Sequence, residues 1–340
     1  FIGTGPYKLR SFGNQHQKID IYNNYWGDKP LNKGIDYINF NSSSTLYASI
    51  RTGEVDLLMS NSINDIQHLA LTKLSQKGLL NEGEGNPTEI GFITFKSNNE
   101  PFNKVNIRKA ISYSLNRDLI SEKVSFGIRK PLKAIIPNQF RKDNSYPWPN
   151  YNPEITRNIL KEEGFCGSQK LELPLTFRSN VPADKLLALT WKEQLKRDLP
   201  ECINLILNGV ESTTVYKQLG DGAFEAVILD WTGAYPDPEA YLSPLISCSE
   251  IIDNTCKKGE SVFSGSFWAN KVSQKYLEDS ELLSGDSRLK LLFLAEDITA
   301  KHSAYLPVWL VKPKAWSQKD ISRPIFNGNG FLELDKLKRK

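Results

Sequence analysis

The pattern of hydrophobic and polar positions along this 340-residue chain predicts strands and helices of an α/β protein. Near the start, the alternating segments 7–12 and 18–24 flank the polar turn GNQHQ and predict a β-hairpin. Apolar residues then recur at helical spacing over 44–53 and 64–78, and each of these segments ends at a glycine. The first 95 residues therefore predict a region of mixed α and β structure.

Two helices in the middle of the chain carry clear signals at their ends. In NIRKAISYSL the apolar residues share one helical face, and Asn106 is the expected N-cap. In YNPEITRNILKEEGF we expect Asn152 to cap the helix, Pro153 to occupy its first turn and Gly164 to lie just past its end.

Residues 171–229 show the order strand, helix, strand, helix, strand, which is typical of a parallel sheet. Because such crossovers make neighbouring strands parallel, their carboxyl ends lie along one edge, where ligands of open α/β sheets bind. Arg178 ends the first of these strands, and the segment DWTGAYPDPEAYL follows the third. We therefore expect the loop 230–242 to form a pocket wall, with Arg178 nearby.

Composition and charge exclude several classes of function. The formal net charge is only +4, and no basic run is interleaved with aromatic residues, so nucleic acid is not an expected partner. No segment reaches the roughly 18 apolar residues that a membrane-spanning helix needs. The four cysteines and three histidines show no zinc-site spacing, so we expect neither a metal nor another cofactor.

Cys248 and Cys256 flank the short polar segment SEIIDNT. A disulfide that closes this loop would suit an oxidising compartment, and two free thiols are the alternative. The chain opens on Phe1, in the middle of a turn, which we interpret as the start of a fragment or a trimmed sequence. The absence of a targeting signal from this sequence is therefore no evidence about where the protein is located.

Five separated segments together resemble the extracytoplasmic solute-binding proteins, family 5, of peptide and nickel ABC transporters. Each segment alone is a weak signal, but their order and spacing span nearly the whole chain. They are GTGPYKL, NNYWG, IRTGEVDLL, ITFKSNNEPFNKVNIRKAISYSLNRDLI and DWTGAYPDPEAYLSPL.

The resemblance implies a two-lobe periplasmic-binding-protein fold of type II, similar to class C, with mixed sheets in an α/β architecture. Lobe I is then expected at 1–95 with 305–340, and lobe II at 96–304. The family's N-terminal part of lobe I and its extra subdomain have no counterpart in this sequence.

The resemblance also implies the function. The chain is expected to be the substrate-binding component of an ABC importer, which binds peptides or peptide-like solutes in a cleft between the lobes without catalysis. Closure of the lobes would then present the solute to permease subunits in the membrane. We expect a monomer in the periplasm or another extracytoplasmic space, with a lipid anchor as one form.

Five residues are predicted to bind the ligand. Trp231 and Tyr235 would be pocket walls, although Trp231 could instead simply pack within lobe II. Arg178 resembles the arginine that grips the ligand carboxylate in dipeptide-binding relatives, and an exposed surface arginine is the alternative. Ala234 stands where peptide-binding members carry an aspartate that pairs with the ligand ammonium. Asp237 or Asp230 could replace that aspartate from a shifted position, the ammonium could stay hydrated, or the ligand could be something other than a free peptide. Asp237 could also simply bond its own turn.

Three alternatives remain open at this point. The solute could be a nickel complex or another small anionic ligand rather than a peptide. The chain could be a secreted hydrolase that uses carboxylates such as Asp230 and Asp237, although it lacks a nucleophile elbow and a histidine placed beside a candidate serine. It could also be a non-functional remnant of a longer protein.

Overall fold

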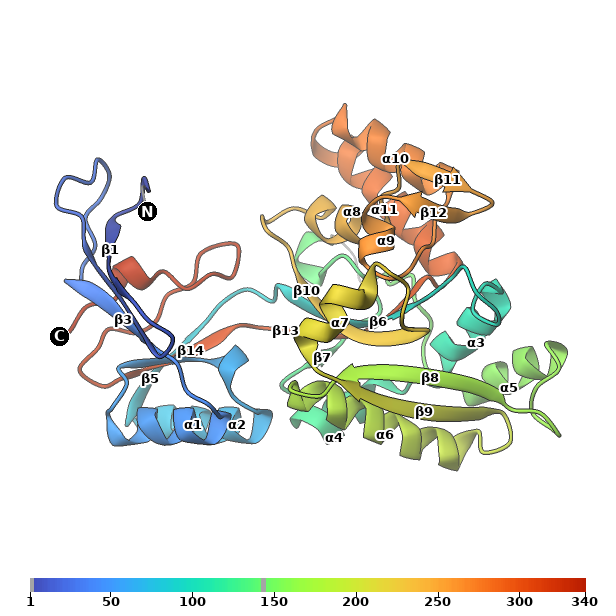
Figure 1. Cartoon of the computed structure of the whole chain (residues 1–340), viewed down its shortest axis with the longest axis horizontal. Coiled ribbons are helices and arrows are strands. Elements are labelled where there is room, and N and C mark those ends of the chain that lie inside the picture. The colour runs from blue at the N-terminus through green and yellow to red at the C-terminus, as the bar shows by residue number, and fades with distance from the viewer. Residues whose placement is uncertain (1–2, 142–144) are drawn as a thin grey trace. The chain divides into compact units, whose positions relative to one another are not determined.

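The computed structural model describes residues 3–141 and 145–340. Contacts divide the chain into a smaller unit, Phe1–Pro87 with Lys312–Lys340, and a larger unit, Thr88–Val311 (Figure 1). The sequence prediction placed the boundaries at 95/96 and 304/305. The structure assigns the strands at 89–95 and 305–311 to the larger unit, because they pair within its central sheet.

The smaller unit combines two three-stranded sheets with two helices. The outer sheet is the antiparallel meander β1-β2-β3, and β1 and β2 form the predicted hairpin. The other sheet has the order β4-β14-β5. The elements are β1 (Tyr7–Phe12), β2 (His16–Ile21), β3 (Gly34–Ile38), α1 (Ser43–Thr52), β4 (Leu57–Met59), η1 (Ser60–Ser62), α2 (Asp65–Gln76), β5 (Leu80–Glu84), β14 (Lys314–Gln318) and η3 (Leu334–Lys336).

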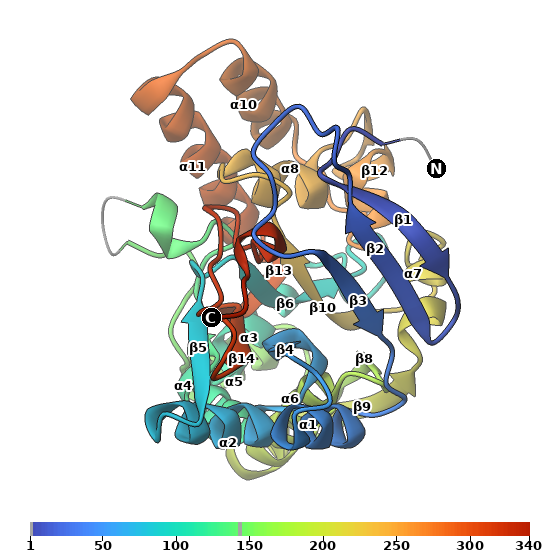
Figure 2. The same cartoon turned by 90° about the vertical axis from the view of Figure 1, so that its left-hand side faces the viewer.

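The core of the smaller unit lies between the β4-β14-β5 sheet and its two helices. Ile50 of α1 and Leu71 of α2 pack on Trp316 of the middle strand, and all three side chains are fully buried. Figures 1 and 2 show both helices on the same side of this sheet. The predicted end of α1 at Gly53 is confirmed. This glycine has a φ of 81°, a left-handed backbone conformation that residues with a Cβ rarely adopt.

The larger unit is built on a six-stranded mixed sheet with the order β7-β13-β6-β10-β8-β9. A separate hairpin, β11-β12, lies outside it. The elements are β6 (Glu89–Phe95), α3 (Val105–Ser114), α4 (Arg117–Ser125), β7 (Lys130–Pro131), η2 (Asn138–Phe140), α5 (Pro153–Glu162), β8 (Leu171–Arg178), α6 (Pro182–Asp198), β9 (Ile203–Val210), α7 (Ser212–Leu219), β10 (Ala226–Thr232), α8 (Glu239–Ile246), β11 (Glu250–Ile252), β12 (Thr255–Lys258), α9 (Glu260–Phe263), α10 (Lys271–Glu281), α11 (Gly285–Lys301) and β13 (Tyr305–Val311).

Alternation along the central strands creates two cores, one on each face of this sheet. In β10, Ala226 and Ile228 face a core that includes α3, α4 and α6. Val227 and Leu229 face the opposite core, which includes α8, α10 and α11. Figure 1 shows α4 and α6 below the sheet and α8, α10 and α11 above it. Burial on both faces explains why this strand reads as a continuous apolar run.

The predicted order β8-α6-β9-α7-β10 is confirmed, and β8 pairs in parallel with both β9 and β10. The carboxyl ends of these three strands therefore lie at one edge of the sheet. Strand β6 runs antiparallel to β10, so that its first residue, Glu89, lies opposite Thr232 near that same edge. This edge holds the loop that the sequence singled out.

Helix ends in the larger unit follow the sequence signals, with one exception. Helix α5 has Asn152 as its N-cap, with Pro153 in its first turn. The prediction for α3 was wrong, because the helix begins at Val105 and Lys104 is the N-cap residue. The amide of Asn106 instead donates to the carboxylate of Glu163, 2.9 Å away.

Two disulfides tie the larger unit together. One joins Cys248 to Cys256 across the β11-β12 hairpin. The other, which the sequence analysis did not foresee, joins Cys166 after α5 to Cys202 before β9. Among the described residues, no helix is both long and apolar enough to span a membrane.

Candidate functional site

The carboxyl ends of β8 and β10 bring an arginine and two carboxylates together. Arg178 is the last residue of β8 and is only 4% exposed. Its Nε lies 2.7 Å from Oδ2 of Asp184, and one Nη lies 2.5 Å from Oδ2 of Asp230. The other Nη donates to the hydroxyl of Tyr216 at 2.7 Å. The prediction that Arg178 and the β10 loop share one strand-end region agrees with these contacts.

These contacts change the interpretation of Arg178. Asp184, in the first turn of α6, is 1% exposed, whereas the side chain of Asp230 is 38% exposed. The guanidinium therefore already faces two carboxylates, and a ligand carboxylate would have to displace Asp230 to reach it. In this structure Arg178 orients Asp230 and Tyr216, and it is not the exposed surface arginine of the alternative interpretation.

The electrostatics of the cluster are dominated by burial. Burial raises the pKa of the Asp184 carboxyl, although the adjacent guanidinium opposes the shift. Burial lowers the pKa of Arg178, but Asp184 and Asp230 outweigh it, so the pKa lies above its usual value. Two carboxyl groups thus meet one guanidinium, and Asp230 is the partly exposed one of the two.

Glu89, at the start of β6, adds another carboxyl group to this edge. Burial raises its pKa to about 7, and the nearby charge of Asp230 acts in the same direction. A guanidinium nitrogen of Arg129 lies 3.7 Å from Glu89 Oε1, too far for a strong ion pair. The ionisation of Glu89 is therefore sensitive to pH near neutrality.

We expect Glu89→Gln to flatten the pH dependence of stability between about pH 5 and 7. The folded-state pKa of Glu89 lies above its ordinary value of 4.5, so the folded state binds more protons in this range. Stability from this group is thus fully present below about pH 4.5 and is lost as pH rises through 7. Denaturant titrations at several pH values measure the free energy of unfolding. A variant whose stability depends on pH as strongly as that of the parent would contradict the prediction.

The loop after β10 is fixed by internal contacts. The indole Nε1 of Trp231 donates to the carbonyl of Ala240 at 2.8 Å, and the half-buried ring packs on the core beneath α8. Gly233 is buried, and a Cβ there would lie 2.7 Å from the ring of Tyr241. Because successive strand residues point to opposite faces, Trp231 lies across the sheet from Asp230. Trp231 thus packs within the larger unit, and its role as a pocket wall stays a prediction.

Two of the predicted ligand residues lie on the exposed part of this loop. Ala234 is exposed, and Tyr235 is 46% exposed. The Tyr235 hydroxyl donates to the carboxylate of Glu239, a bond that raises the pKa of the phenol to about 12. Tyr235 is therefore a neutral, ordered aromatic surface that a solute can contact.

Asp237 has its partners within the larger unit. Its carboxylate oxygens lie 2.7 and 2.9 Å from the two terminal nitrogens of Arg288, and Oδ1 accepts the backbone N–H of Glu239. Burial opposes ionisation, but these bonds outweigh it and lower the pKa of Asp237. Asp237 is therefore engaged by Arg288 and by its own turn, and its role in ligand binding stays a prediction.

Comparison with known families assigns this architecture. The family model for bacterial extracellular solute-binding proteins, family 5 Middle, matches residues 1–253. The chain belongs to this family. The predicted fold class and family resemblance are therefore confirmed, and the family is one of solute-binding proteins rather than enzymes.

Curated relatives and solved structures agree with this assignment. The chain is 26% identical over 318 residues to heme-binding protein A of Haemophilus influenzae, covering 90% of this chain and 54% of the relative. It is 25% identical to the dipeptide-binding protein of Escherichia coli over 73% of this chain and 46% of that relative. The chain thus spans about half the length of these relatives.

Two solved structures show the same fold. A dipeptide-binding protein from Pseudoalteromonas, in complex with Met-Leu, superposes with a TM-score of 0.83 at 20% identity, over 99% of this chain and 64% of that chain. NikA from Brucella suis, in complex with Fe(III)-EDTA, gives a TM-score of 0.82 at 19% identity, over 99% and 68%.

Sequence reasoning missed three groups of this candidate site. Asp184, Tyr216 and Glu89 all contribute to the cluster, yet they come from a helix start, a helix face and a strand start far apart in the chain. Asp184 had one usable signal, since an acidic residue shortly after a proline is typical of the first turn of a helix. Tyr216 and Glu89 had none.

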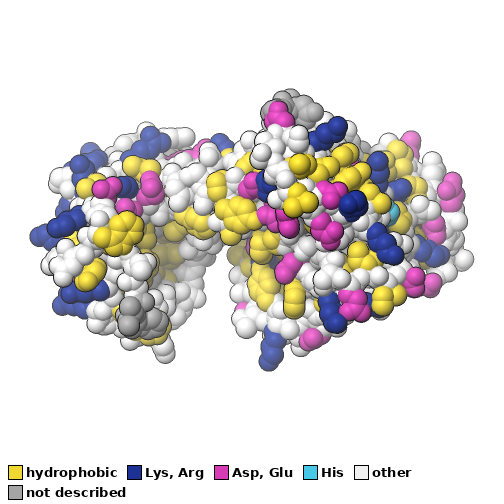
Figure 3. All heavy atoms as spheres, turned by 90° about the horizontal axis from the view of Figure 1, so that it is seen from above, with side chains coloured by type: hydrophobic (Ala, Val, Ile, Leu, Met, Phe, Trp, Pro, Cys, Tyr) yellow, Lys and Arg dark blue, Asp and Glu magenta, His cyan; other side chains and the backbone are white. Residues whose placement is uncertain are grey.

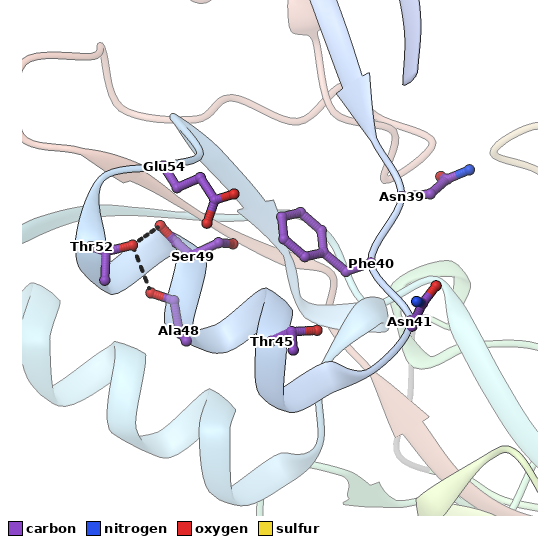
Figure 4. A pocket seen from close by; sticks show the side chains of 8 residues that line it. All are labelled: Asn39, Phe40, Asn41, Thr45, Ala48, Ser49, Thr52 and Glu54. Carbon is purple, nitrogen blue, oxygen red and sulfur yellow. Dashed lines mark hydrogen bonds between the residues drawn. The ribbon is translucent and has the colours of Figure 1, made fainter. Parts of the chain in front are cut away.

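A pocket of about 470 Å³ lies in the smaller unit beside α1. Figure 4 shows the ring of Phe40 turned toward α1, while Asn39 points away from it. Glu54 is the one charged residue among those lining it, and the hydroxyl of Thr52 is used by backbone carbonyls of its own helix. This pocket therefore offers a ligand less chemistry than the strand-end cluster.

Metal binding finds no support in the described part of the chain. There, no group of three or more histidine, cysteine, aspartate or glutamate side chains is arranged to hold a metal ion. On the face of the larger unit in Figure 3, acidic and basic side chains are interspersed with hydrophobic ones. This face lacks the basic stripe that nucleic-acid binding requires.

Proposed function

We propose that this chain is the substrate-binding component of an ABC importer and that it receives peptides or peptide-like solutes at the carboxyl ends of β8 and β10. The solute is released unaltered to permease subunits in the membrane, in an extracytoplasmic space. Membership of family 5 and relatives named as dipeptide-, oligopeptide- and nickel-binding proteins support this role. The lobe boundaries, the closing motion and the monomeric state stay predictions.

The observation that carries the proposed location is the loop that follows β10. It presents the exposed ring of Tyr235 and the methyl group of Ala234, with the partly exposed carboxylate of Asp230 at the end of the same strand. An aromatic surface with few fixed charges contacts varied side chains, which suits a peptide site. The fixed carboxylates of the cluster favour a cationic or neutral solute group over an anionic one at this position.

Native mass spectrometry of the protein purified without added ligand tests this function directly. We expect a bound peptide or peptide-like molecule whose mass is unchanged after release. Incubation with a mixed dipeptide library should then raise the melting temperature without producing free amino acids. Turnover of esters, glycosides or peptides that disappears in Asp230→Ala would instead favour the hydrolase alternative.

Ala234→Asp tests whether this loop faces the amino end of a peptide. The new carboxylate would supply the partner that peptide-binding relatives carry, so we expect free-amine dipeptides to gain about tenfold in affinity over their N-acetylated forms, or about 1.4 kcal/mol. Isothermal titration calorimetry of both forms measures the ratio. Ala234→Asn has a similar shape without the charge and should leave the ratio near its parent value; equal ratios in both variants would remove Ala234 from the site.

A further inference from the structure

A second pocket, of about 620 Å³, lies wholly within the larger unit. Its described walls come from α3, from Lys133 after β7, from residues 146–150, from α5 and from the end of α11. In the pairing of β10 with β6, Thr232 lies opposite Glu89 and Ala226 lies opposite Phe95. The sheet edge that carries the proposed solute site is therefore the edge at which β6 begins. The pocket instead includes Ser303, two residues before β13 begins, and β13 pairs Tyr305 with Thr94 near the end of β6. The two regions therefore lie at opposite ends of the sheet.

Lysines are the charged residues among the described lining residues of this pocket. Lys109, Lys133 and Lys301 line it, and the described part of the lining includes no aspartate or glutamate. The positive charge of Lys301 favours the ionised form of Asp297, one turn earlier in α11. A concave surface lined by lysines concentrates positive potential and attracts anions.

Two buried arginines strengthen this potential. Arg108 precedes Lys109 in α3, and its Nε donates to the carbonyl of His302 at 3.0 Å. Arg117 donates to the carbonyl of Pro149, a lining residue, at 3.0 Å. Both side chains are almost fully buried, and both donate to backbone carbonyls. Burial lowers the pKa of each to about 10, so both stay charged at neutral pH, and an anion nearby would stabilise them.

The remaining walls are aromatic and aliphatic. Tyr113 and Tyr146 supply rings, and Ile155 and Ile159 of α5 supply an apolar side. The ammonium of Lys133 donates to Asn150 at 2.8 Å and lies 5.4 Å from the centroid of the Tyr146 ring. Lys133 is therefore held in place before any ligand arrives, which lowers the entropy lost on binding.

We propose that this pocket is a second ligand site of the chain and that it takes a small organic anion, a phosphate monoester carried on a ring. The lysines bind the phosphate, and the tyrosines and isoleucines contact the ring. The volume falls in the usual range for small-molecule sites. Because it lies at the far end of the sheet, this site is separate from the solute site, and either can be tested without the other.

Phenyl phosphate is the probe, titrated into the full chain at low salt and followed by NMR of the amide signals. We expect saturable binding with shifts that map to α3, α5 and the end of α11. Inorganic phosphate lacks the ring and phenol lacks the charge, so each should bind at least tenfold more weakly. Binding of inorganic phosphate as tightly as phenyl phosphate would overturn the assignment, as would the absence of saturable binding.

Matched variants localise the site. Lys109→Gln with Lys301→Gln removes two of the lining charges, and it should weaken the binding of phenyl phosphate at least tenfold. Lys123→Gln with Lys185→Gln makes the same change in net charge on α4 and α6, where both lysines are exposed, and affinity should stay within twofold. Equal affinities of the two double variants would overturn the proposal. Circular dichroism confirms that both retain the fold.

Discussion

Replacing Arg178 by methionine should lower the free energy of unfolding of the larger unit by about 3–5 kcal/mol at pH 7. Methionine fills a similar volume but leaves Asp184, only 1% exposed, without its bidentate partner. An unpaired buried carboxylate costs far more than the loss of one surface contact. Hydrogen exchange of the β8 and β10 amides reports the unfolding of this unit.

The cause of this loss can be separated from a simple packing defect. Burial already raises the pKa of Asp184, and removal of the guanidinium should raise it further. The loss should therefore shrink as pH falls and Asp184 becomes protonated. Arg178→Met combined with Asp184→Leu removes both buried charges and should recover much of the stability.

Arg157→Met is the matched control for this experiment. Arg157 is on α5 of the same unit, and its ion pair with Glu201 is partly exposed, with side-chain exposures of 30% and 39%. Such pairs contribute less than about 1 kcal/mol. An equal loss from Arg178→Met and Arg157→Met would show that the Arg178 cluster does not stabilise this strand end.

The second large effect is expected from the disulfide between Cys166 and Cys202. Its two cysteines are 36 residues apart, whereas Cys248 and Cys256 are only 8 apart. The loop-entropy relation gives about 4 kcal/mol of stabilisation for the longer loop and about 2.5 kcal/mol for the shorter one. We therefore expect alanine replacement of Cys166 and Cys202 to lower the free energy of unfolding more than alanine replacement of Cys248 and Cys256. Denaturant unfolding measures both losses.

A reducing agent provides the control for the disulfide prediction. With both bridges reduced, the parent protein should lose the part of its stability that the bridges contribute, and the two double variants should approach it. Alanine replacement also removes a little buried volume, and this part of the loss persists under reduction. A cost at Cys248 and Cys256 as large as at Cys166 and Cys202 would contradict the loop-length argument.

The pattern of residues predicted the larger unit well because its elements are bounded by local signals. Asn152, Pro153 and Gly164 mark the ends of α5 through contacts within a few residues, so a local pattern is sufficient. The strand–helix order of residues 171–229 predicted parallel pairing, because a helix between two strands typically forms a crossover that returns the chain to the same end of the sheet. Asn106 failed as a cap because its side chain bonds Glu163, which is distant in sequence.

The candidate site was predicted only in part. The sequence located the strand ends and the loop, and both lie where it placed them. It could not show that Arg178 is already neutralised by Asp184 and Asp230, because those contacts join three elements. Nor could it show that Asp237 forms an ion pair with Arg288, which is 51 residues away in the chain. The availability of a charged group depends on its partners, and partners of this kind are set by packing.

By itself, the sequence determined the family, the α/β architecture and the strand edge that carries the loop, since these follow from periodicity, turns and ordered motifs. Tertiary structure alone decided which charged groups are paired, that Cys166 pairs with Cys202, and that three lysines from distant segments line one pocket. The physical reason is the distance along the chain over which each interaction acts. Capping and alternation act over a few residues, whereas ion pairing, burial and disulfide formation depend on residues that only the folded chain brings together.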